Sequence, residues 1–590
     1  MRASLPVWLT VSAALSQPSL AATTESYDYI IVGAGTCGLL LANRLSRDAN
    51  YTVAVIDPGS DQRHNPNVTD PFGWFGLPPT PVNWNYSSVP QASADGRIIE
   101  FDAGHGIGGT SLMNGMTYIR GDRAQFDAWE ALGNLGWNWD TLLKYYKQLE
   151  KFYPPEAWQV AVGASFESEY HGTSGDLHVG FNPGMLNDTF FDKAKGTWAA
   201  LGQGVNEDVN SGTTAGFGSW PQTLDPELNL RWDSATAFYW PIQDRKNLKL
   251  LNGTVSKIVW KSGSKISLPE ASGVEYFTPD NQRKILTAKK EVIISAGSLR
   301  TPLVLELSGI GNPQLLKKMG IETIVDSPGV GEHMIDQPNM SLEFSTNATF
   351  FGYPPYTTFA NASSLFGSEL GSIEASTKAS LASWAIQVAN SSNGALNATA
   401  LEYLFGIQHG LIFEKGVTIA EILSTGGGNT LLSAYWDLLP FSRGSVHLSS
   451  VTDINKPSIN PKYLSVDFDL QVEIAAGRLC QTFWSTEPIS QFTGKQTKPD
   501  TAQLPPNATD SQWERATKEL FGSNAHSIGT ASMMAWELGG VVDPELKVYG
   551  TSNVRVVDAS VLPMQFSGHL TATLYAVSER AAEFIIKARR

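Results

Sequence analysis

Cysteine is almost absent: the 590 residues contain two, Cys37 and Cys480. A single pair cannot supply the disulfide framework that holds small secreted domains together. A disulfide between these two would also distort the tight turn in which Cys37 lies, so we expect two free thiols. No C-x-x-C or H-E-x-x-H pattern occurs, and the sequence predicts no metal site. Stability must therefore come from the core and from glycans.

Positive charge is also scarce. Lys and Arg number 42 against 57 Asp and Glu, which gives a net charge of −15. This balance disfavours nucleic acid and anionic membranes as partners. Beyond the N-terminus no apolar run reaches the length of a membrane span, and there is no internal repeat. A hydrophobic content of 42% in a chain of this length indicates a globular protein with several domains' worth of sequence.

The N-terminus has the composition of a secretory signal. Arg2 precedes an apolar stretch from Leu5 to Leu15, and Ser19-Leu20-Ala21 supplies the small residues of a cleavage site. We predict a signal peptide over residues 1–21 and a secreted or lumenal protein. Eleven N-x-S/T sequons predict a glycoprotein. They lie at Asn50, Asn67, Asn85, Asn187, Asn252, Asn339, Asn347, Asn361, Asn390, Asn397 and Asn507.

The stretch from Tyr27 to Gly59 has the pattern of a dinucleotide-binding βαβ unit. A buried strand leads into a G-x-G-x-x-G made by Gly33, Gly35 and Gly38, and a helix and a second strand follow, ending at Asp57. Such a helix N-terminus favours a pyrophosphate, and the terminal acid accepts hydrogen bonds from a ribose. An acid there disfavours NADP. The alternative is a tight βα turn without a ligand.

A second glycine-rich stretch runs from Phe101 to Trp129. It contains four closely spaced glycines and three small polar residues: Gly104, Gly106, Gly108, Gly109, Thr110, Ser111 and Asn114. A second loop suits a long cofactor, because one loop can anchor the adenosine diphosphate while the other reaches the far ring. The alternative is a flexible surface loop.

Two histidines occupy predicted loops near the C-terminus. Val554 to Pro563 predicts a strand that ends at Asp558, and residues 570–587 predict an amphipathic helix, so His569 precedes a helix N-terminus. His526 lies 43 residues earlier, in Asn524-Ala525-His526. From the residues alone, a structural histidine is the favoured interpretation of each.

Taken together, these motifs resemble the glucose–methanol–choline family of FAD oxidoreductases, and within it the secreted fungal glucose oxidases and FAD glucose dehydrogenases. The resemblance extends from Tyr27 to Phe584 and includes ISAGSLRTPLVLELSGIGNP and LLPFSRGSVHLSS. It implies an α/β fold in which a Rossmann-like FAD-binding domain is interleaved with an α+β substrate domain built on an antiparallel sheet. The implied division is 27–320 mainly FAD-binding, 321–445 mainly substrate domain, and 446–587 a C-terminal part that carries both histidines and returns to the FAD domain. A homodimer is left open.

The resemblance implies FAD as the cofactor rather than NAD. Asp57 departs from it, because Glu is more frequent at that position. The residues implied to contact FAD are Gly33, Gly35, Thr36, Cys37, Gly38, Asp57, Thr110, Asn114, Gly115, Met116, Val255, Asp558, Ala559 and Thr571.

The resemblance also implies the catalytic groups. His526 and His569 match the N-x-H-x-x-G and S-x-H motifs whose imidazoles face the flavin N5, and Glu421 matches an acid that orients one of them. An imidazole can take the hydroxyl proton of an alcohol near neutral pH, so we predict His526 as the base and His569 as its partner. Without the resemblance, Glu421 would be an ordinary surface acid.

The substrate is an alcohol whose identity the sequence leaves open. In glucose-active relatives an Arg lies four residues before the first catalytic histidine and an aromatic residue just before it; here these are Gly522 and Ala525. Both changes enlarge the pocket and remove polar donors, which disfavours glucose. We predict a bulkier or less polar primary or secondary alcohol, with oxygen or a quinone as acceptor, in fungal secondary metabolism. Glucose oxidase or dehydrogenase, a non-redox cyclase or lyase, and a non-catalytic secreted binding protein are the alternatives.

Overall fold

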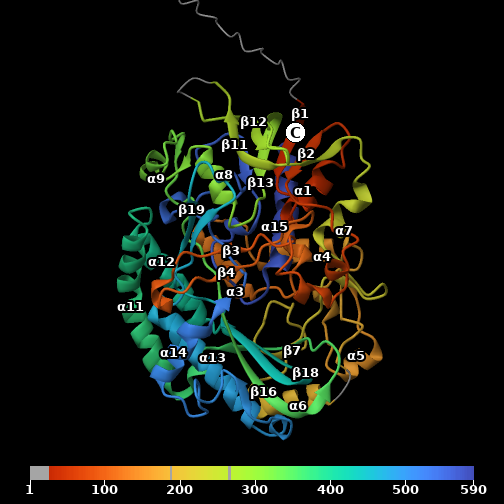
Figure 1. Ribbon diagram of the computed structural model, residues 1–590, viewed down its shortest axis with the longest axis vertical. Helices are drawn as coiled ribbons and strands as arrows, with labels where there is room; N and C mark the ends of the chain where they lie inside the picture. The colour runs from red at the N-terminus through yellow and green to blue at the C-terminus, as the bar shows by residue number, and fades with distance from the viewer. Residues whose placement is uncertain (1–24, 187–188, 263–266, 590) are drawn as a thin grey trace, which may run out of the picture.

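The computed structural model describes residues 25–186, 189–262 and 267–589. The predicted signal peptide and the sequon at Asn187 therefore lie outside the described residues. The chain is built around two sheets, one in the upper half of Figure 1 and one in the lower half, with α15 (Leu570–Lys587) running centrally. The chain passes between the two sheets several times, so each sheet contains strands that are far apart in the sequence.

The first sheet has seven strands in the order β10-β2-β1-β13-β12-β11, with β23 added beside β13. Its strands are β1 (Ser26–Val32), β2 (Val53–Asp57), β10 (Leu248–Asn252), β11 (Thr254–Trp260), β12 (Ala271–Phe277), β13 (Arg283–Ile294) and β23 (Val554–Val556). β1 lies between β2 and β13 and pairs parallel with both, so its side chains Ile30 and Ile31 are fully buried. A continuous apolar run is what a parallel strand covered on both faces requires.

Helix α1 (Thr36–Leu45) connects β1 to β2 and packs against α15. It is buried over nearly its whole length, and the Cys37 thiol points at the Leu574 carbonyl of α15, 3.8 Å away. The C-terminus is fastened to the same place, because Arg589 donates to the Tyr29 hydroxyl and to the Leu45 carbonyl. The first and last helices of the described chain therefore form one layer over the first sheet.

The second sheet has six strands, all antiparallel, in the order β21-β16-β18-β17-β7, with β22 beside β16. These strands are β7 (Gly216–Ser219), β16 (Pro338–Phe350), β17 (Tyr356–Asn361), β18 (Thr418–Asp437), β21 (Gln496–Lys498) and β22 (Gly522–Ser523). The long strand β18 is the centre of this sheet: its first part pairs with β17 and its second part with β16. Residues from both parts reach the candidate site below.

Helices cover the outer side of the second sheet. α13 packs on β18, and α11 lies against α12 at the left edge of Figure 1. The helices described are α2 (Pro66–Thr69), α3 (Arg123–Ala128), α4 (Trp139–Leu149), α5 (Ala157–Ala161), α6 (Phe190–Ala200), α7 (Ser234–Phe238), α8 (Thr301–Leu307), α9 (Pro313–Lys318), α10 (Ala362–Phe366), α11 (Leu370–Ser391), α12 (Ala398–His409), α13 (Asp467–Ser485) and α14 (Asp510–Leu520).

The remaining described strands form short two-stranded pairs. They are β3 (Tyr86–Ser87) with β4 (Glu100–Phe101), β5 (Glu150–Tyr153) with β6 (Leu177–Gly180), β8 (Leu224–Asp225) with β9 (Leu230–Arg231), β14 (Ile310–Gly311) with β15 (Val325–Asp326), and β19 (Ser445–Leu448) with β20 (Pro457–Asn460).

The predicted fold class is confirmed. The chain starts in the first sheet, enters the second at β7, returns for β10 to β13, builds most of the second sheet, and comes back for β23 and α15. This is the interleaving of a Rossmann-like unit with an antiparallel sheet that the motifs implied. The division at residues 320 and 445 stays a prediction.

One local expectation differs from the structure. The strand predicted to run from Val554 to Asp558 ends at Val556. Val557 still donates to the Ile294 carbonyl, but the Asp558 side chain then accepts the Ser560 N–H and caps a short 3₁₀ turn at residues 559–561. An aspartate that can bond its own downstream backbone competes with strand continuation at this point.

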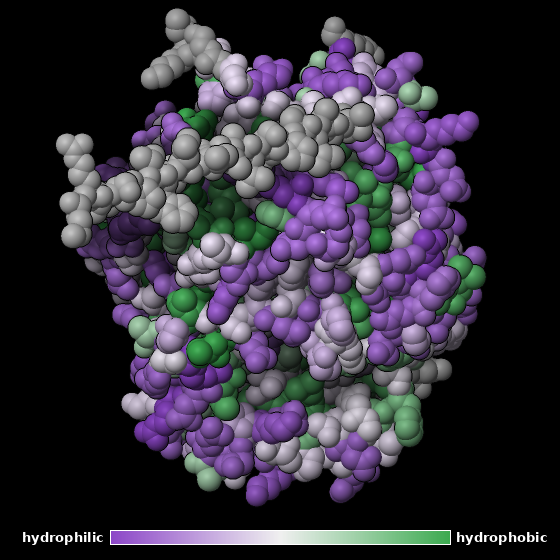
Figure 2. Space-filling view, turned by 45° about the horizontal axis from the view of Figure 1, so that its top comes forward, coloured by the Kyte–Doolittle hydropathy of each residue, from purple (hydrophilic) through white to green (hydrophobic). Residues whose placement is uncertain are grey.

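Both cysteines are free and buried, as predicted. Burial raises the pKa of the Cys37 thiol to about 12, which keeps it protonated and unreactive. No helix within the described ranges is long and apolar enough to cross a membrane. The face in Figure 2 is mostly hydrophilic, with apolar side chains gathered in hollows.

Candidate active site

The first glycine loop follows β1, and two of its glycines are required by the chain itself. Gly33 has φ of +108°, and a Cβ there would lie 2.2 Å from the Ser295 carbonyl oxygen. A Cβ on Gly38 would lie 2.0 Å from the Gly33 carbonyl oxygen. Both positions therefore need glycine for the turn and for the close approach of α1 to the strand.

Gly35 is different, because nothing in the chain requires it to be glycine. Its φ is −91°, an ordinary value, and a Cβ would meet only the Gly109 Cα at 3.8 Å. Gly35 is also the N-cap residue of α1, where no side chain caps the helix. An uncapped helix N-terminus with bare backbone beside it suits a phosphate that approaches closely.

The second glycine loop lies directly against the first. Gly109 has φ of +57°, and a Cβ there would come within 2.6 Å of the Gly35 Cα. Gly108 donates its N–H to the Ala34 carbonyl at 2.8 Å. The two glycine-rich stretches recognised in the sequence are thus brought into backbone contact, and neither is a free surface loop.

Asp57 has a role that the sequence did not reveal. One carboxylate oxygen accepts the Ala34 N–H at 2.8 Å and the other accepts the Gly59 N–H at 2.7 Å. The acid therefore holds the glycine loop in place, while burial raises its pKa. A carboxylate has about four lone-pair directions, so two remain for the ribose contact predicted from the sequence.

Asn114 links the second loop to the helix that follows His569. Its side-chain nitrogen donates to the Thr571 hydroxyl at 3.1 Å. Its side-chain oxygen accepts from the Met116 N–H at 3.1 Å and from the Arg231 guanidinium at 2.7 Å. Met116 has φ of +62°, an uncommon conformation for a residue with a side chain. The structure thus places three of the predicted cofactor contacts, Asn114, Met116 and Thr571, together.

The other predicted cofactor residues border the same loops. The Thr110 hydroxyl accepts the Gly104 N–H, and a Cβ on Gly115 would meet Trp74 at 3.7 Å. Asp558, next to Ala559, accepts the Gly297 N–H at 2.9 Å. Val255 is buried in β11. Thr36 and Cys37 begin α1. The uncapped helix, the bare Gly35 and the buried Ser295 hydroxyl without a partner among the described residues fit a bound dinucleotide.

The two predicted catalytic histidines meet although they come from different elements. His526 follows β22 of the second sheet, and His569 is the N-cap residue of α15. Their ring centroids lie 5.1 Å apart and the ring planes are nearly perpendicular, at 86°. Desolvation and the neighbouring His569 hold the pKa of His526 well below its usual range, so its imidazole is neutral at ordinary pH.

Two residues directly before β16 hold His526 in place. Asp336 accepts the backbone N–H of His526 at 2.7 Å, and the Gln337 side-chain oxygen lies 2.7 Å from Nδ1 of the ring. Ala525, just before it, has φ of +55°, which turns the backbone toward this anchor. Gln565 completes the support by donating to the His526 carbonyl at 2.6 Å.

Glu421 contacts the other histidine. Its Oε1 lies 3.2 Å from Nε2 of His569 and accepts a long hydrogen bond, 3.3 Å, from Thr357 on β17. Glu421 is fully buried in β18. Trp436, from the far part of β18, sets its indole perpendicular to the His569 ring at 6.0 Å, and its N–H has no acceptor among the described residues.

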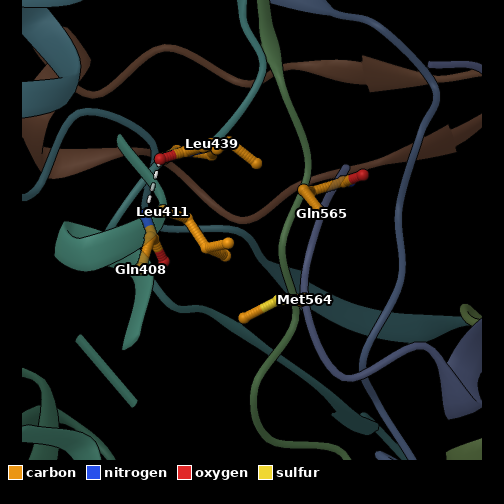
Figure 3. A pocket seen from close by; sticks show the side chains of 6 residues that line it. Gln408, Leu411, Leu439, Met564 and Gln565 are labelled. Atoms are coloured by element: carbon orange, nitrogen blue, oxygen red, sulfur yellow. Dashed lines mark hydrogen bonds between the residues drawn. The ribbon is translucent and has the colours of Figure 1, made fainter. Parts of the chain in front are cut away.

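A small cavity lies next to Gln565, the residue that donates to the His526 carbonyl. Figure 3 shows Leu411, Gln408 and Leu439 on one side of it and Met564 and Gln565 on the other. Its volume of about 10 Å³ is at the lower limit for one water molecule. The amide of Gln565 is thus held between this cavity and the His526 backbone.

The structure adds five residues to the site that the sequence motifs did not indicate: Asp336, Gln337, Thr357, Trp436 and Gln565. None belongs to a local motif, and each reaches the histidines only through strand pairing or loop packing. The one signal in the sequence is the alternation of apolar and polar residues from Pro338 to Phe344, which begins directly after Asp336 and Gln337.

A βαβ unit with a glycine loop packs against a second glycine loop, and Asn114 links this second loop to the helix that begins after His569. This combination is typical of a flavin-dependent oxidoreductase. Family comparison agrees: models of the GMC oxidoreductase family match residues 27–339 and 440–578. The chain belongs to the GMC oxidoreductase family, whose members are FAD-dependent enzymes acting on CH–OH donors.

The similarity to known proteins extends over almost the whole chain. A glucose oxidase-like protein of Humicola fuscoatra is 49% identical over 98% of this chain and 99% of its own, and a glucose oxidase of Penicillium chrysogenum is 33% identical over 95% and 92%. Among solved structures, an FAD-dependent oxidoreductase from Chaetomium thermophilum superposes with a TM-score of 0.86 at 28% identity, covering 96% of this chain and 100% of that one. A fungal aryl-alcohol oxidase superposes with a TM-score of 0.82 at 26% identity, covering 95% and 99%.

The geometry of the glycine loop makes a direct prediction for Gly35→Val. The chain leaves room for the first side-chain carbon at this position, so the variant should fold, but its branches should block the pyrophosphate and give a colourless protein. Gly38→Ala is the contrast: it places a carbon against the Gly33 carbonyl and should lower thermal stability instead. Flavin absorbance and melting temperature separate the two. A yellow Gly35→Val protein with normal flavin content would contradict the assignment.

Proposed function

We propose that this protein is a secreted FAD-dependent oxidoreductase that oxidises a primary or secondary alcohol to a carbonyl, with His526 as the base. The observation that carries the proposal is the perpendicular pair of His526 and His569, which lies where the helix after His569 meets the second glycine loop.

The reaction removes a hydride and a proton from the alcohol. FAD, when bound, supplies the acceptor for the hydride that leaves the carbinol carbon. The hydroxyl proton goes to His526, whose depressed pKa keeps the imidazole neutral and ready to accept it. His569 holds the alcohol oxygen from the perpendicular direction, and Glu421 fixes the orientation of the His569 ring.

The N-terminal turn of α15 contributes an electrostatic effect. A helix N-terminus carries roughly half a positive charge. His569 is its N-cap residue and Thr571 lies in its first turn. Negative charge that develops beside this turn during the reaction is therefore stabilised.

The two positions near His526 that differ from glucose-active relatives both carry small residues. A Cβ on Gly522 would meet nothing within 4 Å, and Ala525 presents only a methyl group. Trp436 adds an aromatic wall beside His569. These features support a bulkier or less polar alcohol than glucose, such as an aryl alcohol or an intermediate of fungal secondary metabolism.

Glucose is the second candidate substrate. In its favour, relatives with the names glucose oxidase and glucose oxidase-like protein match over almost the whole chain. Against it stands the missing sugar-binding Arg at Gly522, because a site built around hydroxyl groups loses selectivity when a donor is removed.

A non-redox cyclase or lyase on the same scaffold is the third candidate. It would use FAD structurally, and the intact histidine pair counts against it. Loss of the flavin absorbance when an alcohol is added without oxygen would exclude it. A panel of alcohols tested in this way identifies the substrate, and reoxidation of the reduced flavin by oxygen or by a quinone identifies the acceptor.

Replacing His526 by Ala tests the base. The variant should keep FAD and its fold, because the glycine loops are separate from the His526 turn, but the rate of flavin reduction should fall roughly 10²–10⁴-fold. Stopped-flow reduction by the best alcohol of the panel measures this. A wild-type rate would show that the base is another group, and an equal loss in His569→Ala would show that the pair acts as a unit.

Gly522→Arg tests the assigned reason for disfavouring glucose. The open space at Gly522 accommodates the new side chain, whose guanidinium can then donate to sugar hydroxyls. We expect kcat/KM for glucose to rise and that for the bulkier alcohol to fall. Gly522→Met is the control, because it fills the same open space with a side chain that has no hydrogen-bond donor. No change in the preference between the two substrates would refute this explanation.

Secretion predicts glycans on exposed sequons. Asn67, Asn390 and Asn507 are exposed, whereas Asn339 lies in β16 and donates its side-chain amide to Asn524 at 2.7 Å. Enzymatic deglycosylation should lower the apparent mass markedly, and peptide mapping should find Asn339 unmodified. A secreted protein whose mass does not change would contradict the prediction.

A further inference from the structure

Nδ1 of His526 has two polar neighbours that make opposite demands on it. The Gln337 oxygen lies at 2.7 Å and can only accept a proton, whereas the Asn524 amide nitrogen lies at 3.0 Å and can only donate one. If Nδ1 carried a lone pair, it would face the Gln337 oxygen at 2.7 Å with no proton between them. The shorter contact therefore requires a proton on Nδ1.

The second hydrogen bond of the Gln337 side chain shows which of its amide atoms is the oxygen and which is the nitrogen. Amide oxygen and nitrogen are assigned from the hydrogen-bond network, so the far partner decides. The nitrogen of the Gln337 amide donates to the Leu438 carbonyl at 3.1 Å. Exchanging the two atoms would set the amide oxygen against that carbonyl in a fully buried place, leaving both acceptors unpaired.

Gln337 is itself held tightly. Its backbone carbonyl accepts the Asn524 N–H at 3.0 Å, and its neighbour Asp336 accepts the His526 N–H. Asn524 has another acceptor for its amide, because the Gln337 oxygen also lies 3.3 Å away, and its own oxygen accepts from Asn339. Every group around Nδ1 is therefore satisfied when the ring carries its proton there.

We infer that Gln337 is a positioning residue: it holds His526 in the Nδ1–H form, which leaves the lone pair on Nε2 as the atom that takes the substrate proton. Within the described residues Nε2 makes no hydrogen bond, so it is available to the alcohol. This inference rests on the proposed role of His526 as base, but it concerns the proton on the resting ring and can be tested separately.

The direct test is ¹⁵N NMR of the FAD-loaded enzyme labelled at histidine, with His526→Ala used to assign the His526 signals. The wild type should show a protonated Nδ1 and an unprotonated Nε2. In Gln337→Leu the acceptor is gone, and the Asn524 amide can donate to Nδ1; the proton should then move to Nε2. A wild type with the proton on Nε2 would overturn the inference.

Gln565→Leu is the matched control. Gln565 is also a buried glutamine that contacts His526, but it bonds the backbone carbonyl and not the ring. This variant should keep the Nδ1–H signal. If Gln565→Leu moves the proton as Gln337→Leu does, the effect is general loosening of the loop, and Gln337 has no special role.

Kinetics give a second readout. In Gln337→Leu the lone pair is on the wrong nitrogen, so the rate of flavin reduction should fall between about tenfold and 10⁴-fold at every pH, as when a ring-orienting acid is lost in a serine protease. Binding of the alcohol should change less than the rate. An unchanged rate would overturn the inference.

Gln337→Glu separates proton position from charge. The variant loses the hydrogen bond to the Leu438 carbonyl, but its carboxylate still accepts from Nδ1 and restores the Nδ1–H form. Its negative charge favours the imidazolium and raises the pKa of His526. The other titratable groups near His526 are unchanged in this variant: Asp336 at its backbone N–H, His569 beside its ring, and Glu421 beyond His569. Because imidazolium cannot accept a proton, the acid limb of the pH–rate profile should move to higher pH, with activity recovered above it. A profile that falls equally at all pH values would contradict the inference.

The outcomes also distinguish the two hypotheses. If wild-type His526 carries its proton on Nδ1 but His526→Ala reduces its flavin at the normal rate, the role of Gln337 in setting the ring form stands and the proposed base is wrong. If Gln337→Leu does not fold, the wild-type spectrum and the Gln337→Glu profile decide.

Discussion

Backbone contact between the two glycine loops is the constraint on which the site depends. Gly35 and Gly109 approach so closely that a single carbon on Gly109 would collide, and the Gly108–Ala34 hydrogen bond fastens the loops together. The contact requires β1, α1 and the second loop to have fixed relative positions. Asp57 holds the first loop from the side of β2. These contacts between the loops come from the chain itself, and a preorganised loop pair reduces the entropy lost when a cofactor binds.

From this contact the structure extends through Asn114 to the two proposed catalytic histidines. Its hydrogen bond to Thr571 connects the second loop to the first turn of α15, and His569 caps that helix. His526 comes from the opposite side, from the second sheet, and is held by the turn before β16. His526 is thus positioned by the second sheet, whereas His569 is positioned by the start of α15 and by Glu421 of β18. The candidate site lies where these elements meet. Any shift between the sheets changes the angle between the rings.

The sequence was informative where function is carried by consecutive residues. The βαβ unit was recognised with its boundaries nearly correct, because apolar runs, glycines and a terminal acid occur at fixed spacing. The helix from Leu570 to Lys587 agrees at both ends with the predicted one, since its apolar residues recur with helical period. It was less informative for α11, whose Ser- and Ala-rich sequence shows little contrast between buried and exposed faces. The predicted end of the strand at Asp558 is wrong, since β23 ends at Val556, because an aspartate side chain competes with strand pairing.

The sequence by itself therefore determined the fold class and, through the resemblance of its motifs to a known family, the cofactor class and the two candidate histidines, because motif spacing carries those features. The tertiary structure alone decided how the histidines meet, that Glu421 contacts His569, and that Asp336 and Gln337 hold His526. It also separated Gly35 from Gly33 and Gly38, since only the positions of Ser295 and Gly109 reveal which glycine the chain could replace. These contacts join residues that are far apart in the chain. Strand register and loop packing bring such residues together, and no local pattern encodes either.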